Sequence, residues 1–320
     1  MATYRYLHYD VFTHRALEGN QLAVFPEPAG LTADAMQRVT REMNFSECTF
    51  IFPPDAPQSI GSSPQQAGAE KVDVRMRIFT PGEELPMAGH PTVGSTFALV
   101  KEGVIARGQR DFVFGLGVGP TPVSIDWKDG EIDFAWMTQK NAEYLGAIKD
   151  RARFAESIGL RERELGPAPP EVASSGNPFL IAPLASREAV DRVDINRPAY
   201  AACCAAAGLK ETALFVFSIE PMEPSEPGEP EPSVYSRMVG PGLGVSEDPA
   251  TGSATGPLGC YVHKHRLLPP ERLAHFVSLQ GVKMLRPSRL HVSIEANGDA
   301  ITRVRVGGRS VLVGEGRLTF

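Results

Sequence analysis

The sequence has few cysteines, and their spacing offers neither a metal site nor a disulfide framework. The four cysteines of the 320 residues are Cys48, Cys203, Cys204 and Cys260. No pair has the C-x-x-C spacing, so we expect reduced and mostly buried thiols. Histidine is scarce too, with 7 residues, and no H-E-x-x-H sequence occurs. We expect the protein to use no metal and no cofactor.

Long apolar runs and an excess of positive charge are also missing. No stretch approaches the ~20 apolar residues that a membrane-spanning helix needs. The first residues lack the basic start and apolar core of a secretory signal, so we expect a cytoplasmic protein. The net charge of −6 argues against nucleic acid or an anionic membrane as the main partner.

The length and composition indicate a globular protein with more than one domain. Hydrophobic residues make up 42% of the chain and charged residues 22%, which suits a protein with a sizeable core. A chain of 320 residues exceeds the usual size of one compact domain. We place the boundary so that residues 1–118, completed by 300–320, form the N-terminal lobe and 119–299 the C-terminal lobe.

Short apolar strands outnumber helices along the chain, which predicts an α+β fold. We expect helices at 32–43, 91–102, 150–158 and 199–207. Thr32 is the expected N-cap of the first helix, and Pro91 marks the start of the second, because proline is tolerated at the first helical position. Two stretches rich in proline and polar residues, 53–70 and 221–232, are predicted to be solvated loops.

An internal repeat is the most informative pattern in the sequence. The segment 84–92 reads ELPMAGHPT and the segment 247–255 reads EDPATGSAT, so Glu, Pro, Gly and Thr coincide at one offset (247 − 84 = 163). Each segment leads into an apolar helix. A fainter echo relates Gly19-Asn20 to Gly176-Asn177 at an offset of 157. We infer a duplication and therefore two similar lobes.

The repeated segment delivers small residues into the start of a buried helix. The first backbone N–H groups of a helix have no internal partner and carry partial positive charge, so they attract carboxylates and developing negative charge. We therefore expect a small carboxylated substrate to contact Gly89, Pro91, Thr251 and Gly252. The alternative is a pair of ordinary helix starts that bind nothing.

Five stretches of the sequence match motifs of one family. They read GNQLAVF at 19–25, NFSECTF at 44–50, RIFTP at 77–81 with ELPMAGHPT at 84–92, EDPATGSA at 247–254, and QG at 280–281 followed by RPS at 286–288. In this combination the chain resembles the PhzF family, the phenazine-biosynthesis isomerase group within the diaminopimelate-epimerase-like fold. The sequence departs from the family motifs at Cys48, Met87 and Leu285, where the family has Thr, Phe and Gly.

The resemblance implies a fold, an assembly and a reaction. The fold is two lobes, each a curved and mostly antiparallel sheet wrapped around a central helix, with the active site between them. The assembly is a homodimer. The family's type reaction is the isomerisation of trans-2,3-dihydro-3-hydroxyanthranilate, in which a proton moves along a diene.

The resemblance also implies site residues by their position in the motifs. The family's acid/base glutamate falls on Glu47, and the remaining site residues fall on His90, Asp248 and Ser253. Gly89 and Gly252 supply backbone contacts.

Each of these side chains has more than one interpretation. The apolar neighbours of Glu47 would move its pKa towards the working range of a general acid/base, although a strand-edge Glu pointing to water is the alternative. His90 would carry a second proton, orient the substrate or be purely structural. Asp248 would hold His90, accept from a substrate amine or hydroxyl, or cap the local turn. Ser253 is an N-cap or a donor to substrate.

Two observations narrow the function. Related epimerases and racemases use one cysteine at each helix entrance, whereas these entrances read Ala-Gly-His at 88–90 and Thr-Gly-Ser at 251–253. The Gly-rich stretch 115–119 is not followed by the helix that a dinucleotide site needs. The lead hypothesis is a cofactor-independent isomerase with Glu47 as proton shuttle. The alternatives are an epimerase that uses a carboxylate and His90, and a non-catalytic binding protein.

Overall fold

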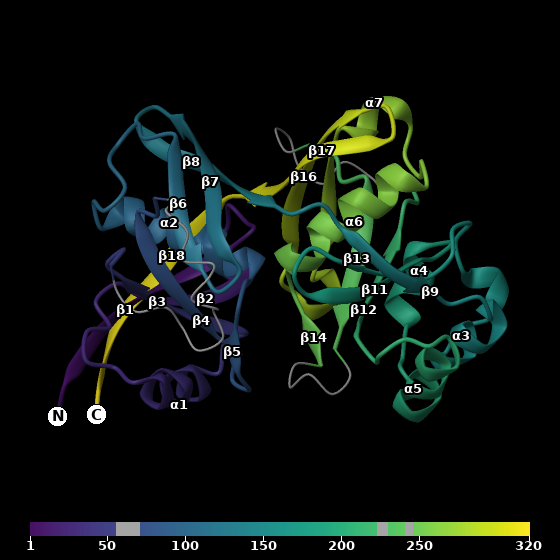
Figure 1. The fold of residues 1–320 in the computed structure, drawn as a ribbon, viewed down its shortest axis with the longest axis horizontal. Helices are drawn as coiled ribbons and strands as arrows, with labels where there is room; N and C mark the ends of the chain where they lie inside the picture. The colour runs from purple at the N-terminus through teal and green to yellow at the C-terminus, as the bar shows by residue number, and fades with distance from the viewer. Residues whose placement is uncertain (56–70, 223–229, 241–245) are drawn as a thin grey trace. The chain divides into compact units, whose positions relative to one another are not determined.

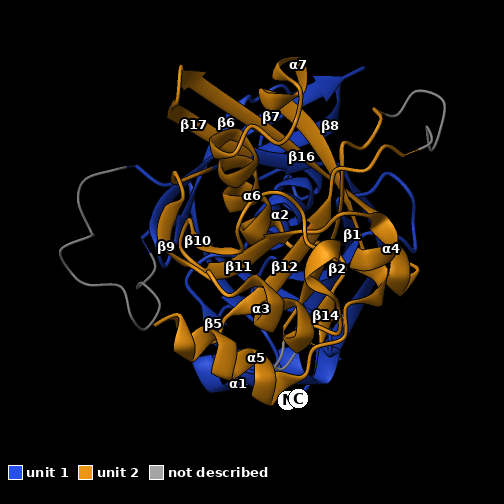
Figure 2. Cartoon of the chain, turned by 90° about the vertical axis from the view of Figure 1, so that its right-hand side faces the viewer, with its two compact units in different colours: residues 1–138, 306–320 blue, residues 139–305 orange. Residues whose placement is uncertain are grey.

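A computed structural model describes residues 1–55, 71–222, 230–240 and 246–320 (Figure 1). The chain forms two compact units, residues 1–138 with 306–320 and residues 139–305 (Figure 2). Most of the two predicted loops, 53–70 and 221–232, lies outside the described residues. The α+β prediction is confirmed, because strands dominate and helices are interspersed among them.

Unit 1 is built on one continuous series of paired strands. Along the sheet the order is β18, β1, β2, β3, β4, β6, β7 and β8. The β2–β3 and β4–β6 pairs are parallel, and the others are antiparallel. The bounds are β1 Thr3–Val11, β2 Asn20–Phe25, β3 Glu47–Phe52, β4 Val74–Phe79, β5 Glu84–Leu85, β6 Asp111–Leu116, β7 Gly119–Lys128, β8 Glu131–Gln139 and β18 Ser310–Thr319.

Two helices make the parallel crossovers of unit 1. Helix α1 (Ala33–Met43) is capped by Thr32 as predicted, because the Thr32 hydroxyl accepts from the backbone N–H of Ala35 at 3.2 Å. Helix α2 (Gly89–Lys101) is buried on every side from Gly89 to Leu99, and it packs against β1, β2 and β3. A helix without a polar face belongs inside a core, so α2 is the central helix of the unit.

Unit 2 repeats this arrangement. Its strands are ordered β9, β10, β11, β12, β13, β15 and β16, with parallel pairs at β11–β12 and β13–β15. Strand β17 (Ala300–Gly308) carries the chain back into unit 1. The other bounds are β9 Glu143–Ala147, β10 Glu171–Ser174, β11 Pro178–Pro183, β12 Ala213–Ser218, β13 Val234–Val239, β14 Glu247–Asp248, β15 His275–Gln280 and β16 Ser288–Asn297.

The helices of unit 2 differ in number from those of unit 1. Helix α6 (Gly252–Lys264) is buried from Gly252 to Val262 and packs against β10, β11 and β16. The smaller helices form a second core cluster with residues such as Phe154, Tyr200 and Leu214. Their bounds are α3 Arg151–Ser157, η2 Glu162–Glu164, α4 Arg187–Arg192, α5 Arg197–Ala206, α7 Pro270–Leu273 and η3 Val282–Met284.

The two units share the order of their strand pairs and the position of the central helix. Both have antiparallel, parallel and antiparallel pairs in the same order, followed by a two-residue strand, a buried helix and a second parallel pair. Helices α2 and α6 each span 13 residues and begin 163 residues apart (252 − 89). The offset read from the sequence is therefore the offset of the central helices.

Several boundaries differ from the prediction for local reasons. Unit 1 continues to Thr138 instead of ending at 118, because β6, β7 and β8 pair in succession as hairpins. Helix α2 begins at Gly89, so the expectation that Pro91 is its first residue is wrong. Within the described residues, no helix is both long and apolar enough to cross a membrane.

Candidate active site

Glu47 and His90 lie side by side at one end of unit 1. Glu47 is the first residue of β3, and His90 is the second residue of α2. The distance from His90 Nε2 to Glu47 Oε2 is 3.5 Å. The His90 side chain is 3% exposed and that of Glu47 is 14% exposed, so the carboxylate keeps a small opening to solvent. The structure thus brings together two of the predicted site residues, a carboxylate and an imidazole.

Burial sets the charge of His90. Removal from water disfavours the imidazolium and lowers the pKa of His90 from 6.5 to about 3, while a contact with the Gln21 backbone acts weakly in the opposite direction. His90 is therefore neutral at ordinary pH. A neutral imidazole donates or accepts a hydrogen bond, but it supplies no positive charge to Glu47.

Asn20 contacts the other nitrogen of the same ring. Its Nδ2 lies 3.2 Å from His90 Nδ1, and both side chains are buried. Asn20 is the first residue of β2, which pairs in parallel with β3, so the starts of two neighbouring strands approach the start of α2. Gly19 precedes it with φ +67°, where a side chain would meet the Val11 carbonyl at 2.3 Å. The Gly19-Asn20 motif therefore has a steric cause.

The entrance of α2 is made of small and buried residues. Ala88 is the N-cap and makes no side-chain cap hydrogen bond. Gly89, His90 and Pro91 form the first three helical positions and are buried. Pro91 is tolerated at the third position, because the first four N–H groups of a helix have no internal partner. The amides of Gly89 and His90 remain as the donors of the first turn.

Asp248 and Thr251 form the corresponding entrance in unit 2. The Thr251 hydroxyl donates to Asp248 Oδ2 at 2.5 Å, and both side chains are 7% exposed. This contact supports the local-turn interpretation of Asp248. Thr251 is the N-cap of α6, and Gly252 and Ser253 are its first two residues. The interpretation of Ser253 as an N-cap is therefore wrong, and its hydroxyl stays available as a donor.

Two buried glutamines hold the α6 entrance in place. Gln280, at the end of β15, donates to the Asp248 carbonyl at 2.7 Å and to the Thr251 hydroxyl at 3.0 Å, and it accepts from the Thr251 N–H at 3.2 Å. Gln139 donates to the Gly252 carbonyl at 2.9 Å. These bonds satisfy polar groups that burial would otherwise leave costly, and they fix the turn before the helix.

The strand register identifies the counterparts of Glu47 and His90 in unit 2. In unit 1, Glu84 pairs with Phe79 and Phe79 with Cys48, the residue after Glu47. In unit 2, Glu247 pairs with Val239 and Val239 with Leu214, the residue after Ala213. Ala213 therefore occupies the position of Glu47.

The same comparison covers the helix entrances. Ser253 occupies the position of His90, because each is the second residue of a central helix. Neither Ala213 nor Ser253 titrates near neutral pH. The Glu–His pair is thus present in unit 1 and absent from the equivalent positions of unit 2.

A bidentate ion pair clamps each entrance strand to its neighbour. Arg77 binds Glu84 through Nε at 2.8 Å and Nη2 at 2.6 Å. Arg237 binds Glu247 through the same two nitrogens, each at 2.8 Å. The first Glu of each repeated segment is therefore structural.

A proline lies close to a glycine beside each entrance. A side chain at Gly117 would meet the Cα of Pro86 at 2.8 Å, and one at Gly281 would meet the Pro249 carbonyl at 2.6 Å. Pro86 and Pro249 are related by the same offset of 163. The Gly-rich stretch 115–119 thus provides the close approach of a hairpin to the entrance.

The cysteines lie within the cores. All four are free and buried, as predicted. Cys48 follows Glu47 in β3 but packs with Phe50 and Phe79, and burial raises the pKa of its thiol to about 12. Cys260 lies in the third turn of α6, beyond its entrance. Among the described residues, no group of three or more His, Cys, Asp or Glu side chains is placed to hold a metal ion.

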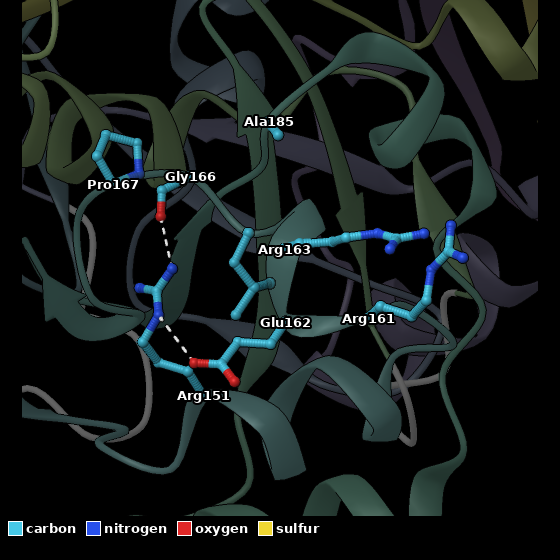
Figure 3. A pocket seen from close by; sticks show the side chains of 8 residues that line it. Arg151, Arg161, Glu162, Arg163, Gly166, Pro167 and Ala185 are labelled. Carbon is cyan, nitrogen blue, oxygen red and sulfur yellow. Dashed lines mark hydrogen bonds and ion pairs between the residues drawn. The ribbon is translucent and has the colours of Figure 1, made fainter.

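A separate pocket of about 810 Å³ lies in unit 2 and contains none of the predicted site residues (Figure 3). It is lined by Arg151, Arg161, Glu162, Arg163, Leu165, Gly166, Pro167 and Ala185. Its charged groups are largely engaged in holding the fold. Arg151 donates to the Gly166 carbonyl at 2.7 Å.

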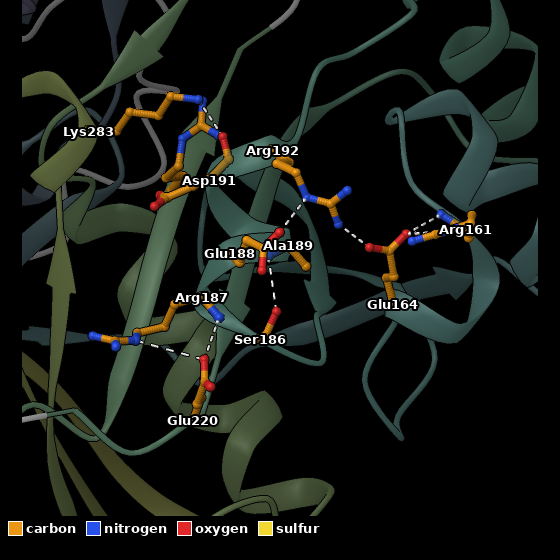
Figure 4. A network of polar contacts seen from close by, with 11 residues as sticks. Arg161, Glu164, Ser186, Arg187, Glu188, Ala189, Asp191, Arg192, Glu220 and Lys283 are labelled. Atoms are coloured by element: carbon orange, nitrogen blue, oxygen red, sulfur yellow. Dashed lines mark hydrogen bonds and ion pairs between the residues drawn. The ribbon is translucent and has the colours of Figure 1, made fainter.

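A polar network adjoins this pocket and joins η2 to α4 (Figure 4). Glu164 accepts from Arg161 and Arg192, and these hydrogen bonds lower its pKa to about 2. The neighbouring Arg187 backbone N–H donates to Glu220 at 2.8 Å. The network holds η2 and α4 together and so has a structural role. The entrances of α2 and α6 remain the stronger candidates for a functional site.

Sequence reasoning missed two residues that position the site. The sequence shows Asn20 as part of a repeat, but its contact with His90 depends on the parallel pairing of β2 with β3. The sequence shows Gln280 in the QG motif, but the residues that it contacts, Asp248 and Thr251, lie far earlier in the chain. Their signal was polar residues placed at the ends of apolar strands.

The chain matches the family model of phenazine biosynthesis-like proteins over residues 9–316. It is 34% identical to an uncharacterized isomerase of Mesorhizobium japonicum, covering 99% of both chains. It is 32% identical to the trans-2,3-dihydro-3-hydroxyanthranilate isomerase of Pseudomonas aeruginosa, covering 98% of this chain and 99% of that protein.

Solved structures show the same fold. A PhzF-family phenazine biosynthesis protein of Bacillus anthracis superposes with a TM-score of 0.79 over 100% of both chains at 24% identity. A protein described as a predicted epimerase of P. aeruginosa has a TM-score of 0.75 at 32% identity, with 99% of each chain covered. A hydroxyproline epimerase of Agrobacterium vitis, at 14% identity and a TM-score of 0.60, shares the fold over 99% of this chain and 92% of its own.

Proposed function

The chain belongs to the phenazine biosynthesis-like protein family, and we propose that it moves a proton on a small cyclic or amino- or hydroxy-carboxylate with Glu47 as acid and base. Relatives that match over nearly the full length are named isomerases, which makes the chain an isomerase. The substrate class follows the name of the P. aeruginosa relative, which is 32% identical. The proposed reaction uses side chains and backbone groups of the protein and no cofactor.

The contact between Glu47 and His90 is the observation that carries the proposal. A carboxylate that is mostly buried yet slightly open is placed to take a proton from a bound molecule and return it at another carbon. Burial keeps His90 neutral, so Glu47 is the group of this pair that changes charge during the reaction. The backbone N–H groups at the start of a buried helix such as α2 would stabilise a substrate carboxylate and negative charge that develops on the conjugated carbons.

Asp248, Thr251 and Ser253 are proposed to bind the substrate rather than to carry its proton. Asp248 is fixed by the Thr251 hydroxyl, and Thr251 by Gln280, so this entrance is rigid before substrate arrives. Gly252 places no side chain over the backbone beside the Ser253 hydroxyl. From the family resemblance we also propose that the chain assembles as a homodimer.

Proton transfer through two thiols finds no support in the arrangement of cysteines. Cys48 and Cys260 are buried within cores, and burial raises the pKa of both thiols. A one-carboxylate shuttle is therefore favoured over the two-base chemistry of a racemase. An epimerase that uses Glu47 and His90 would need His90 to accept a proton, which its low pKa disfavours.

Replacement of Glu47 by Gln tests the proposal. With trans-2,3-dihydro-3-hydroxyanthranilate in deuterated water, we expect the wild type to exchange and relocate a substrate hydrogen, followed by proton NMR. Glu47→Gln should lower the rate by about 10²–10⁴-fold, the usual contribution of a general acid/base.

The matched control is Glu42→Gln, the same change at an exposed position on α1, which should leave the rate unchanged. Full exchange by Glu47→Gln would exclude Glu47 as the shuttle. Exchange at a stereocentre with inversion and no relocation would instead identify an epimerase.

A further inference from the structure

Asn20 and Glu47 flank the His90 ring on its two nitrogens. Asn20 Nδ2 lies 3.2 Å from Nδ1, and Glu47 Oε2 lies 3.5 Å from Nε2. The three side chains come from the first residue of β2, the second residue of α2 and the first residue of β3. Asn20 and His90 are buried, so water cannot substitute for either partner at Nδ1. The proton on this neutral ring must sit on one nitrogen or the other.

The nitrogen that carries the proton determines whether Glu47 faces an N–H donor or a lone pair. With the proton on Nε2, the ring donates towards the Glu47 carboxylate. With the proton on Nδ1, a lone pair of Nε2 faces the carboxylate oxygen, which repels the ionised form and favours a protonated Glu47. The tautomer therefore determines whether Glu47 rests as a base or as an acid.

We propose that Asn20 is a positioning residue that fixes the tautomer of His90, so that Nδ1 accepts from the Asn20 amide and Nε2–H points at Glu47. The amide nitrogen is a donor only, so its contact with Nδ1 requires a lone pair there. His90 then holds Glu47 in its ionised, proton-accepting form. This inference deepens the proposed function and rests on it for its catalytic meaning.

The competing acceptor is the backbone carbonyl of Gln21. It contacts the ring and would accept from a ring N–H, which is why it acts to raise the pKa of His90. Within the part of the chain that the structure describes, the ring has three polar neighbours, Asn20, Gln21 and Glu47. The amide donor at Nδ1 and the carbonyl acceptor of Gln21 thus act together on the tautomer, and through it on the resting state of Glu47.

The tautomer can be measured directly without substrate. Protein labelled with ¹⁵N-histidine gives the protonated nitrogen from long-range ¹H–¹⁵N correlations, and His90→Gln assigns the signal. We expect the wild type to carry the proton on Nε2. A wild-type ring protonated on Nδ1 would overturn the proposal, and this result is independent of whether turnover is ever detected.

Asn20→Asp provides the matching change. The new carboxylate would accept from Nδ1–H, so we expect the proton to move to Nδ1 and the titration midpoint of His90 to rise by at least about one pH unit. Deuterium exchange into substrate should fall by at least about tenfold. If tautomer and midpoint both stay at their wild-type values, Asn20 does not position the ring.

Asn177→Asp is the control, because Asn177 holds the same position in the repeat of unit 2 and Ser253 there replaces the histidine. It should leave the His90 signal unchanged. Asn20→Ala separates positioning from packing, since it should give a mixture of both tautomers in a protein that stays folded. A single Nε2–H tautomer in this folded variant would contradict the proposal.

Discussion

His90 lies in the first turn of α2 with its side chain 3% exposed, and burial lowers its pKa to about 3. A histidine in that state does not switch charge at physiological pH, although the residue type is chosen for such switching elsewhere. The same residue at the surface would be an acid or base in its own right. Here its role follows from burial and from its two neighbours, Asn20 and Glu47.

The depressed pKa of His90 predicts a pH dependence of stability. Between pH 6.5 and about 3 the unfolded chain binds a proton at His90 that the folded chain does not, so stability is lost as pH falls through this window. His90→Gln removes this penalty. We expect its destabilising effect in urea unfolding to be about 2–3 kcal/mol smaller at pH 4.5 than at pH 7.5.

The control for this prediction is His14→Gln at an exposed position. It should show the same difference from wild type at both pH values. A pH-independent effect of His90→Gln would mean that His90 titrates alike in the folded and unfolded chain.

At the level of elements, each central helix is entered through the same set of contacts. A short strand is clamped by an Arg–Glu pair, a proline packs against a glycine hairpin, and small residues open the helix. Arg237 additionally donates to the carbonyls of Val190 and Asp191, at 2.8 and 3.1 Å, so the clamp of unit 2 also holds α4. The two clamps share a geometry and differ in how many elements they join.

This difference predicts unequal costs for the same substitution. Arg237→Met removes a buried guanidinium and leaves the partly buried Glu247 unpaired and several carbonyls without a donor, so we expect a loss of about 3–5 kcal/mol. Arg77→Met should cost less, about 1–3 kcal/mol, because the Arg77 side chain is 16% exposed and that of Arg237 is 6% exposed. Chemical denaturation measures both.

Arg38→Met serves as the reference, since its pair with Asp34 is 3.9 Å long and both side chains are more than 70% exposed. Its effect should stay within about 0.5 kcal/mol. An equal loss for all three substitutions would show that the clamps contribute no more than a surface ion pair.

At the scale of the whole chain, the two units differ in the number of chain segments that form them. Unit 2 is one segment, residues 139–305, whereas unit 1 needs residues 306–320 to complete it. Strand β18 in that last segment pairs with β1 along its full length. Until the chain has been completed, the N-terminal strand β1 therefore has β2 as a partner but lacks its second partner, β18.

Fragments test this asymmetry. We expect residues 139–305 alone to unfold cooperatively, because their core clusters are internal to the segment. Residues 1–138 should unfold without a sharp transition, and addition of a 306–320 peptide should restore one in circular dichroism. A cooperative transition of 1–138 without the peptide would show that β18 is dispensable.

Much of the fold and site was predictable from repeated local patterns. The offset of 163 located both central helices, since glycine, proline and small residues are needed wherever a chain turns into a buried helix. The equivalence of Glu47 with Ala213 was not predictable, because it depends on strand register and the two sequences around them share no motif. The boundary at 138 was missed for a similar reason, as successive hairpins carry no domain signal.

The asymmetry between Glu47–His90 and Ala213–Ser253 has a consequence for ancestry. A duplicated gene places two descendants of one ancestral half in a single polypeptide, exposed to the same cell and the same selection. One descendant carries a carboxylate and an imidazole, and the other carries a methyl and a hydroxyl at the matching positions. The side chains of each half can therefore be compared, position by position, with those of the other half of the same chain. The paired substitution Ala213→Glu with Ser253→His would give the second half the same two side chains that the first half carries at these positions.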